Sequence, residues 1–361
     1  MIKPDWEQSR KRFEAWWDGS ALDRVLLQVY APKKQIPPNA PPAVQPKSLE
    51  DQWFGIDYRL DAFEHQLAHT HYAGDAFPFF ETHIGPGTMS LYLGAKPELQ
   101  PNTVWYEKCW EDIATAPGPA VDKDNRYWQF SRRLLAAAVS RLRGRALVAF
   151  PDLIENLDTL SSLLGNRELL FYLVDAPEHV HRLQRPLVDI YVHYHTRLYE
   201  IIRDEIGGSC FSAFQTWAPG RVAKLQCDFS AMISAKMFEA FVAPYLAEQC
   251  RKIDYTVYHL DGECALQHLE ILLSIKDLNG IQWTPGAGKP SAGDACYHWL
   301  WKKVRAAGKS CMVRGASPEQ AREMVETFGP EWLDITVWLP SEGEAEELAK
   351  QAKSWCRQTS D

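Results

Sequence analysis

The sequence predicts an α/β fold in which parallel strands close into a (β/α)8 barrel, with an N-terminal helical extension and insertions. Strand-like and helix-like segments alternate through the second half of the 361-residue chain, as they do where helices cover a parallel sheet. About eight strand candidates occur, and the GxGxxG and P-loop patterns of nucleotide-binding sheets are absent. A closed barrel is therefore favoured over a doubly wound sheet.

The first half of the chain opens with an amphipathic segment, followed by a proline-rich stretch. We expect a helix over residues 5–18, a strand over 24–30 and a loop or arm over 32–46. Residues 1–50, which hold these three elements, are expected to form an accessory layer of a single domain spanning 1–361, because a lone helix is marginal by itself. Further elements expected here are a helix over 56–71, a strand over 75–83, a hairpin strand over 103–110, a helix over 124–143 and a strand over 146–150.

The second half alternates strand and helix more regularly. Serines at positions suited to helix N-caps are Ser234, Ser317 and Ser341, and Pro177 suits the first turn of a long helix over 177–206. The expected strands and extended segments cover residues 210–217, 225–229, 253–259, 280–283, 310–313 and 333–338.

The composition argues against two classes of partner. A net charge of −8 and a pI near 5.8 do not suit a nucleic-acid binder, which needs a basic surface. No apolar run approaches the roughly 18 residues of a membrane span. The first residues carry no apolar signal segment, and none of the eight cysteines has C-x-x-C spacing. We therefore expect a cytoplasmic protein with reduced thiols that acts on a small molecule.

A histidine and an aspartate end the strand predicted near residue 259. Because side chains alternate along a strand, His259 and Asp261 project from the same face. Such a pair can bind a metal, or the aspartate can fix the tautomer of a catalytic imidazole. The simpler interpretation is a His–Asp hydrogen bond that only caps the strand end.

Other predicted strand exits carry polar residues with two interpretations each. Gln226 and Asp228 share a face, and Asp228 is either a catalytic or ligand carboxylate or a cap of nearby backbone amides. Asp152 is either a catalytic group or a helix cap. Gln215 and Trp217 share a face and are expected to offer an amide and an aromatic wall to a substrate.

Three further residues are candidates for substrate binding. His83 precedes a Gly-Pro-Gly turn whose backbone amides can approach an anion. Arg314 ends a strand and is a candidate clamp for a carboxylate or phosphate, with a surface salt bridge as the alternative. Trp283 lies at another strand exit. The residues expected to face one cavity at the C-terminal ends of the strands are Asp152, Gln215, Asp228, His259 and Trp283.

Three stretches of the second half form a recognisable combination: residues 216–246, Tyr-His-Leu-Asp-Gly at 258–262 and Gly-Ile-Gln-Trp-Thr-Pro-Gly-Ala-Gly at 280–288. Together with residues 150–165 and the turn at 83–87, this combination resembles the uroporphyrinogen decarboxylase superfamily, and more narrowly its branch grouped with methylcobalamin methyltransferases. It implies a TIM barrel with a deep cleft at the C-terminal ends of the strands. Two features depart from the family. Nothing here matches the Arg-Gln-Ala-Gly-Arg type segment that the decarboxylases carry near the N-terminus, and the His-x-Cys zinc pair of the thiol methyltransferases reads His259-Leu260-Asp261.

The resemblance implies methyl transfer, linked to a corrinoid protein or to a small acceptor activated by a metal such as zinc, with His259 and Asp261 as ligands. The alternative is decarboxylation or a related lyase reaction, with Asp228 or Asp152 steering protonation and Arg314 holding a carboxylate. A third possibility is a barrel that binds a ligand without turnover.

Overall fold

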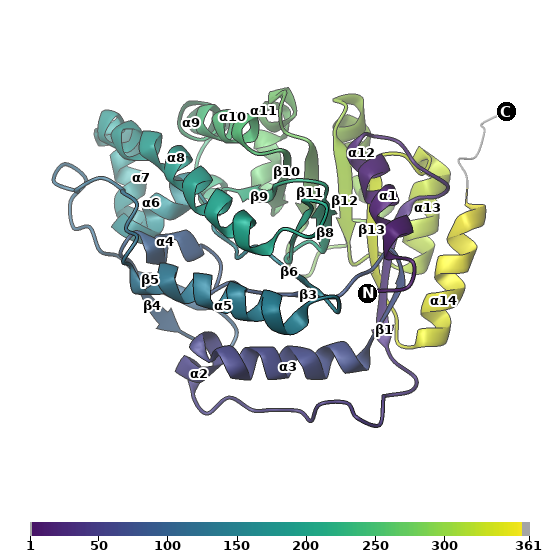
Figure 1. The fold of residues 1–361 in the computed structure, drawn as a ribbon. Helices are drawn as coiled ribbons and strands as arrows, with labels where there is room; N and C mark the ends of the chain where they lie inside the picture. The colour runs from purple at the N-terminus through teal and green to yellow at the C-terminus, as the bar shows by residue number, and fades with distance from the viewer. Residues whose placement is uncertain (1, 356–361) are drawn as a thin grey trace.

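The chain folds as a mixed α/β structure around a seven-stranded sheet (Figure 1). The computed structural model describes residues 2–355. The strand order is β2-β1-β13-β12-β11-β10-β9, and all neighbours are parallel except β2, which runs antiparallel to β1. The strands are β1 (Leu26–Pro32), β2 (Thr70–Gly74), β9 (Val222–Gln226), β10 (Tyr255–Asp261), β11 (Gly280–Thr284), β12 (Ser310–Arg314) and β13 (Leu333–Trp338).

Shorter strands continue the parallel arrangement beyond β9. Strand β3 (Phe79–Phe80) pairs parallel with β6 (Leu147–Val148), and a parallel bridge from Phe150 to Phe211 joins this pair to β7 (Ser209–Phe211). Within residues 2–355, no strand pairing joins β3 to β1, so the hydrogen-bonded sheet does not close.

Helices surround the strands: α12 packs beside β12, α13 beside β13, and α14 beside β1 and β2 (Figure 1). They are α1 (Trp6–Trp17), α2 (Leu49–Phe54), α3 (Ile56–His69), α4 (Thr88–Tyr92), α5 (Arg126–Leu142), α6 (Asn156–Leu164), α7 (Asn166–Asp175), α8 (Pro177–Ile202), α9 (Ala235–Phe241), α10 (Ala243–Lys252), α11 (Leu269–Ser274), α12 (His298–Ala306), α13 (Pro318–Phe328) and α14 (Glu342–Gln351). Short 3-10 turns are η1 (Asp228–Met232), η2 (Glu263–His268), η3 (Ala295–Tyr297) and η4 (Ala352–Ser354).

The predicted helix starts are confirmed by their caps. Ser234, Ser317 and Ser341 each accept a hydrogen bond from the backbone N–H three residues later, and Gln320 completes a capping box with Ser317. None of the described helices is long and apolar enough to cross a membrane. The seven cysteines within residues 2–355 are free thiols, and Cys356 lies outside the described residues.

The strand predicted over residues 210–217 is wrong. The segment forms an antiparallel hairpin of β7 and β8 (Thr216–Ala218), in which Cys210 lies opposite Trp217. Gln215 turns the chain with a φ of 49°, a conformation that a residue with a Cβ rarely adopts. The strand predicted over 75–83 is also reduced to Phe79–Phe80. A hairpin of β4 (Lys96–Leu99) and β5 (Val104–Glu107) stands where an inserted hairpin strand was expected.

Helix α1 covers the N-terminal ends of the strands. The indole of Trp16 donates to the carbonyl of Trp332, just before β13, and the indole of Trp17 donates to the carbonyl of Trp217. The ring of Phe13 meets those of Phe77 and Trp217 edge-on. These aromatic side chains are buried, so α1 and β1 belong to the same core as the second half of the chain.

A buried carboxylate ties three segments of this end together. Asp75 is fully buried and pairs with Arg12 of α1 at 2.9 Å and with Arg24 at 2.5 Å. It also accepts the backbone N–H of Leu27 in β1. Two guanidinium groups and an amide thus replace the water that this carboxylate loses on burial.

Replacing Trp16 with Ala should destabilise the protein by about 3–5 kcal/mol, because the change leaves a large cavity between α1 and the strands and removes an indole hydrogen bond. Urea denaturation measures the effect. The exposed Trp299 is the matched control, and its replacement with Ala should cost less than about 1 kcal/mol. Equal costs for the two variants would contradict the role given to α1.

Candidate functional site

The strand ends bring three ligand-type side chains together. Asp228, His259 and Asp261 each offer a ligand atom, and these atoms lie within 4.8 Å of one another. His259 and Asp261 end β10, and Asp228 begins the turn η1 directly after the neighbouring β9. Because the two strands run parallel, their C-terminal ends meet at one edge, which is how residues 31 positions apart become neighbours.

The hydrogen bonds of Gln282 fix the tautomer of His259. Gln282 lies beside His259 in register on β11, and its Oε1 contacts the imidazole Nδ1. Its Nε2 donates to the Trp283 carbonyl at 2.8 Å and to the Thr284 hydroxyl at 2.9 Å. Since a carbonyl only accepts, the amide nitrogen must face Trp283 and the amide oxygen must face His259. The imidazole therefore donates from Nδ1 and keeps a lone pair on Nε2 for a metal or a proton.

Asp228 is set up to exchange a proton near neutral pH. Partial removal from water raises the pKa of its carboxyl to about 7, and repulsion from Asp158 adds to this rise while Lys224 opposes it. Gln226 donates to Asp228 Oδ2 at 3.0 Å. Gln226 and Asp228, which were expected to share a face, are thus in direct contact.

Two acidic residues at the start of α6, Glu155 and Asp158, accept hydrogen bonds from the backbone around Asp228. Both oxygens of Asp158 accept backbone N–H groups at 2.8 Å, one from Asp228 and one from Phe229. Glu155 accepts the backbone N–H of Gln226 at 3.0 Å. Burial raises the pKa of both carboxyls. The capping of backbone amides that Asp228 was a candidate for is therefore performed by Asp158.

A buried lysine lies at the centre of these acids. Lys224 of β9 pairs with Asp152 at 2.6 Å, and both side chains are almost fully buried. The Lys224 ammonium also lies 5.9 Å from the centre of the Phe214 ring. Burial lowers the pKa of His259, and the positive charge of Lys224 lowers it further, which keeps the imidazole neutral.

His83 lies near Lys224 and Asp152, at the same end of the strands as Asp228 and His259. Its Nε2 is 3.5 Å from Glu81, and its ring meets that of Trp53 edge-on at 6.0 Å. Burial lowers the pKa of His83, and the charges of Asp152 and Lys224 are close enough to contribute. The structure thus brings Asp152, Asp228 and His259, three of the five residues expected to share one cavity, to one end of the strands, and His83 lies there as well.

The loop after β6 is strained where it meets this end. Ile154 and Asn156 have φ values of 51° and 57°. A β-branched residue in this region is a genuine outlier, and such strain is typical of functional loops. The backbone carbonyl of Asp152 accepts from the Thr88 N–H at 2.8 Å, which helps to hold the loop in this conformation.

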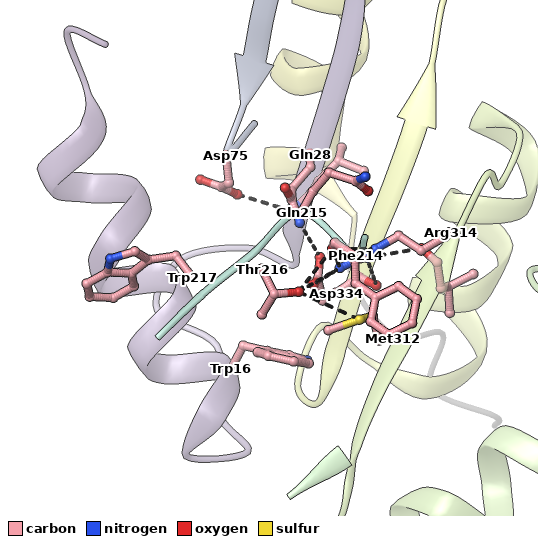
Figure 2. A network of polar contacts seen from close by, with 12 residues as sticks. Trp16, Gln28, Asp75, Phe214, Gln215, Thr216, Trp217, Met312, Arg314 and Asp334 are labelled. Carbon is pink, nitrogen blue, oxygen red and sulfur yellow. Dashed lines mark hydrogen bonds and ion pairs between the residues drawn. The ribbon is translucent and has the colours of Figure 1, made fainter. Parts of the chain in front are cut away.

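Arg314 does not act as a free clamp for a ligand. Its guanidinium pairs with the fully buried Asp334 at 2.5 Å and donates from Nε to the carbonyl of Phe214 at 2.8 Å (Figure 2). Gln28 donates to the other oxygen of Asp334 at 2.9 Å. The donors of Arg314 therefore hold the β7–β8 hairpin against β12 and β13 and are not directed at a substrate.

The two tryptophans expected to bind a substrate are packed elsewhere. Trp217 is fully buried, its indole donates to Asp204 at 2.9 Å, and it points away from the Arg314 network in Figure 2. Trp283 is also fully buried and packs edge-on against Tyr297. Gln215 lies in the hairpin turn and donates to the Ser212 carbonyl. Trp217 and Gln215 lie away from the expected cavity because the chain forms a hairpin there and not a single strand. Trp283 lies away from it because the alternation of side chains along β11 turns its indole toward the helices.

A cavity of about 470 Å3 opens beside Asp228. It lies between the β4–β5 hairpin, the start of α6 and η1. By contrast, the space among the strands beneath Phe214 amounts to about 10 Å3. Asp228 therefore borders the cavity beside the inserted hairpin, whereas little space remains among the strands beneath Phe214.

Comparisons with known proteins concern the fold. No family model matches the chain, and no curated protein matches it in sequence. Among solved structures, the chain is similar to a methyltransferase from Methanosarcina mazei with a TM-score of 0.58 and 11% identity, over 96% of this chain and 98% of that chain. The chain thus shares the fold of that methyltransferase along almost its whole length.

Asp228→Asn should change the pH dependence of stability. The pKa of Asp228 is about 7 in the folded chain and about 3.9 when unfolded, so the folded state binds this proton more tightly. The stability that the wild type gains from this tighter proton binding is complete below about pH 4 and is lost as the pH rises through 7. The melting temperature of Asp228→Asn relative to wild type should therefore increase between pH 4 and pH 8. Thermal melts test this, with the exposed Glu239→Gln as control; a difference independent of pH would contradict it.

Arg314→Met should destabilise the protein by about 3–5 kcal/mol, because the change leaves the Asp334 carboxylate buried without a counter-charge. Adding Asp334→Asn removes that charge and should recover a large part of the loss, which urea denaturation of the single and double variants measures. An unchanged stability of Arg314→Met would restore the interpretation of Arg314 as a clamp free to bind a ligand.

Proposed function

We propose that this chain is a methyl-transfer enzyme in which Asp228, His259 and Asp261 hold a divalent metal ion such as zinc. The observation that carries the proposal is the convergence of these three side chains, with the Nε2 lone pair of His259 left free by Gln282. The likeness in fold to a methyltransferase over nearly the whole chain supports the same reaction class.

The residues present fit a metal with nitrogen and oxygen ligands. One imidazole and two carboxylates form the donor set, and no thiolate belongs to it. Three protein ligands leave positions for a substrate atom, as catalytic sites do. When bound, such an ion lowers the pKa of a coordinated group or polarises it. Binding also relieves the repulsion among the neighbouring acids, because a divalent charge stabilises ionised carboxylates.

The side chains of the site have separate tasks in this proposal. Gln282 orients the imidazole of His259, and burial, together with the charge of Lys224, lowers the pKa of that imidazole and favours its neutral form. Asp228 is a ligand of the ion in its ionised form, so metal binding competes with the proton that its raised pKa favours in the metal-free chain. Asp152 balances the charge of Lys224 within the buried mouth.

We also propose that the parallel strands close into a TIM barrel in one domain. The bridge from Phe150 to Phe211 and the β3–β6 pair support it, since they continue the parallel order beyond β9. A corrinoid protein as the methyl-carrying partner, and a cytoplasmic location, belong to the same proposal. The lyase alternative is weaker because Arg314, its expected carboxylate clamp, is engaged by Asp334.

Metal binding tests the proposal directly. The purified chain should contain, or take up after chelation, about one divalent ion per molecule, as elemental analysis and calorimetry measure. His259→Ala should abolish tight binding, and Gln282→Leu should weaken it roughly 10- to 100-fold, because the imidazole loses its orienting partner. The exposed His193→Ala is the control and should bind like wild type. Equal metal affinity in His259→Ala would refute the site.

Turnover tests the reaction class. With methylcobalamin or a corrinoid protein as partner, methyl transfer to or from candidate substrates should require the bound ion. Asp261→Asn should retain more activity than His259→Ala, since an amide oxygen still offers a weaker ligand. Full activity of His259→Ala would retire the assignment.

A further inference from the structure

The cavity beside Asp228 is a groove with an aromatic wall. The inserted β4–β5 hairpin contributes Trp105 and Tyr106, and η1 contributes Phe229 and Met232. Asp228, which belongs to the three-residue cluster, also lines this groove. A ligand in the groove can therefore reach the cluster with one end while the rest of it lies against the hairpin.

Trp105 differs from the other exposed tryptophans. Its side chain is 62% exposed and has no ring, cation or hydrogen-bond partner within residues 2–355. Trp338 stacks on Tyr30, and Trp299 lies beneath the ammonium of Lys303. An exposed indole without a partner, on the wall of a groove, offers its face to a planar ring. The exposed thioether of Met232 suits the edge of such a ring.

The groove offers little free charge away from Asp228. The carboxylate of Asp158 is occupied by two backbone amides, and the Lys108 ammonium is 3.2 Å from Glu111. Ser161 and Ser162 contribute hydroxyl groups, which donate to the Asp158 carbonyl and keep lone pairs as acceptors. Apolar and weakly polar surfaces of this kind favour an uncharged aromatic ligand over an ionic one.

We propose that the substrate is an aromatic compound whose methyl-bearing heteroatom is attached to the ring, such as an aryl methyl ether or the corresponding phenol. This inference rests on the proposed function and names its substrate class. The ring lies against Trp105, and the heteroatom reaches the Asp228–His259–Asp261 cluster. On transfer, the bond between methyl carbon and ring-bound oxygen breaks, the methyl group passes without the bonding electrons to a nucleophile such as a reduced corrinoid, and the oxygen takes up a proton.

Calorimetric binding of 4-methoxybenzyl alcohol to the full chain tests the proposal. Its saturated counterpart, (4-methoxycyclohexyl)methanol, has similar size and polarity but no planar ring. The aromatic probe should bind the wild type roughly two- to tenfold more tightly than the saturated one. Trp105→Leu should remove this preference, and Trp105→Phe should keep most of it. Trp299→Leu is the matched control and should leave both affinities unchanged.

Three results would overturn the proposal: no saturable binding of the aromatic probe to wild type, equal affinity for both probes, or an unchanged preference in Trp105→Leu. Trp105 is exposed, so circular dichroism melts of its variants should match those of the Trp299 variant. The binding assay is run on chelated protein, which separates it from the proposed function. If the protein binds metal but shows no preference for the aromatic probe, only the proposed substrate class is refuted. If it prefers the aromatic probe but binds no metal, the proposed metal-dependent reaction is refuted.

Discussion

The buried ion pair of Arg314 and Asp334 is the contact on which the mouth of the strands depends. It joins the end of β12 to β13, and through the carbonyl of Phe214 it fixes the β7–β8 hairpin. The fixed hairpin places the Phe214 ring 5.3 Å from the ring of His259. The surroundings of His259, a candidate metal ligand, therefore depend on the Arg314–Asp334 ion pair, which lies on other strands. Arg314 has the chemistry of a substrate clamp but holds the structure together instead.

The electrostatics of the site follow from one lysine among several acids. Lys224 is paired with Asp152, so its charge does not neutralise Asp228, Asp158 and Glu155 as well. Burial disfavours the ionised forms of Asp158 and Glu155, and partial removal from water does the same for the more exposed Asp228, so the pKa values of all three carboxyls are raised although Lys224 opposes the rise. A divalent cation at the open edge would add the positive charge that Lys224 does not supply, and His259 and Asp261 complete the donor set there.

Strand alternation and parallel order made part of the site predictable. They placed His259 with Asp261 and Gln226 with Asp228, and the register of β9 and β10 then brings the pairs together. They could not find Lys224, which has the appearance of an ordinary strand residue, or Asp158, which resembles an acid in the first turn of a helix. The β7–β8 hairpin escaped because its turn depends on Gln215 at positive φ, a conformation imposed by tertiary contacts and not signalled by a glycine or proline.

The two ends of the strands contribute to the folding free energy with opposite sign. At the C-terminal end, Ile154 and Gln215 hold backbone conformations that each cost on the order of 1–3 kcal/mol, beside carboxyls crowded out of water. At the N-terminal end, α1 buries Trp16 and Trp17, and each such side chain contributes a stabilisation of similar or larger size. Since a domain has only a small net stability, the aromatic packing of α1 helps to offset the cost of the strained, acid-rich end. The N-terminal helix is thereby linked to the chemistry at the far end of the strands without touching it.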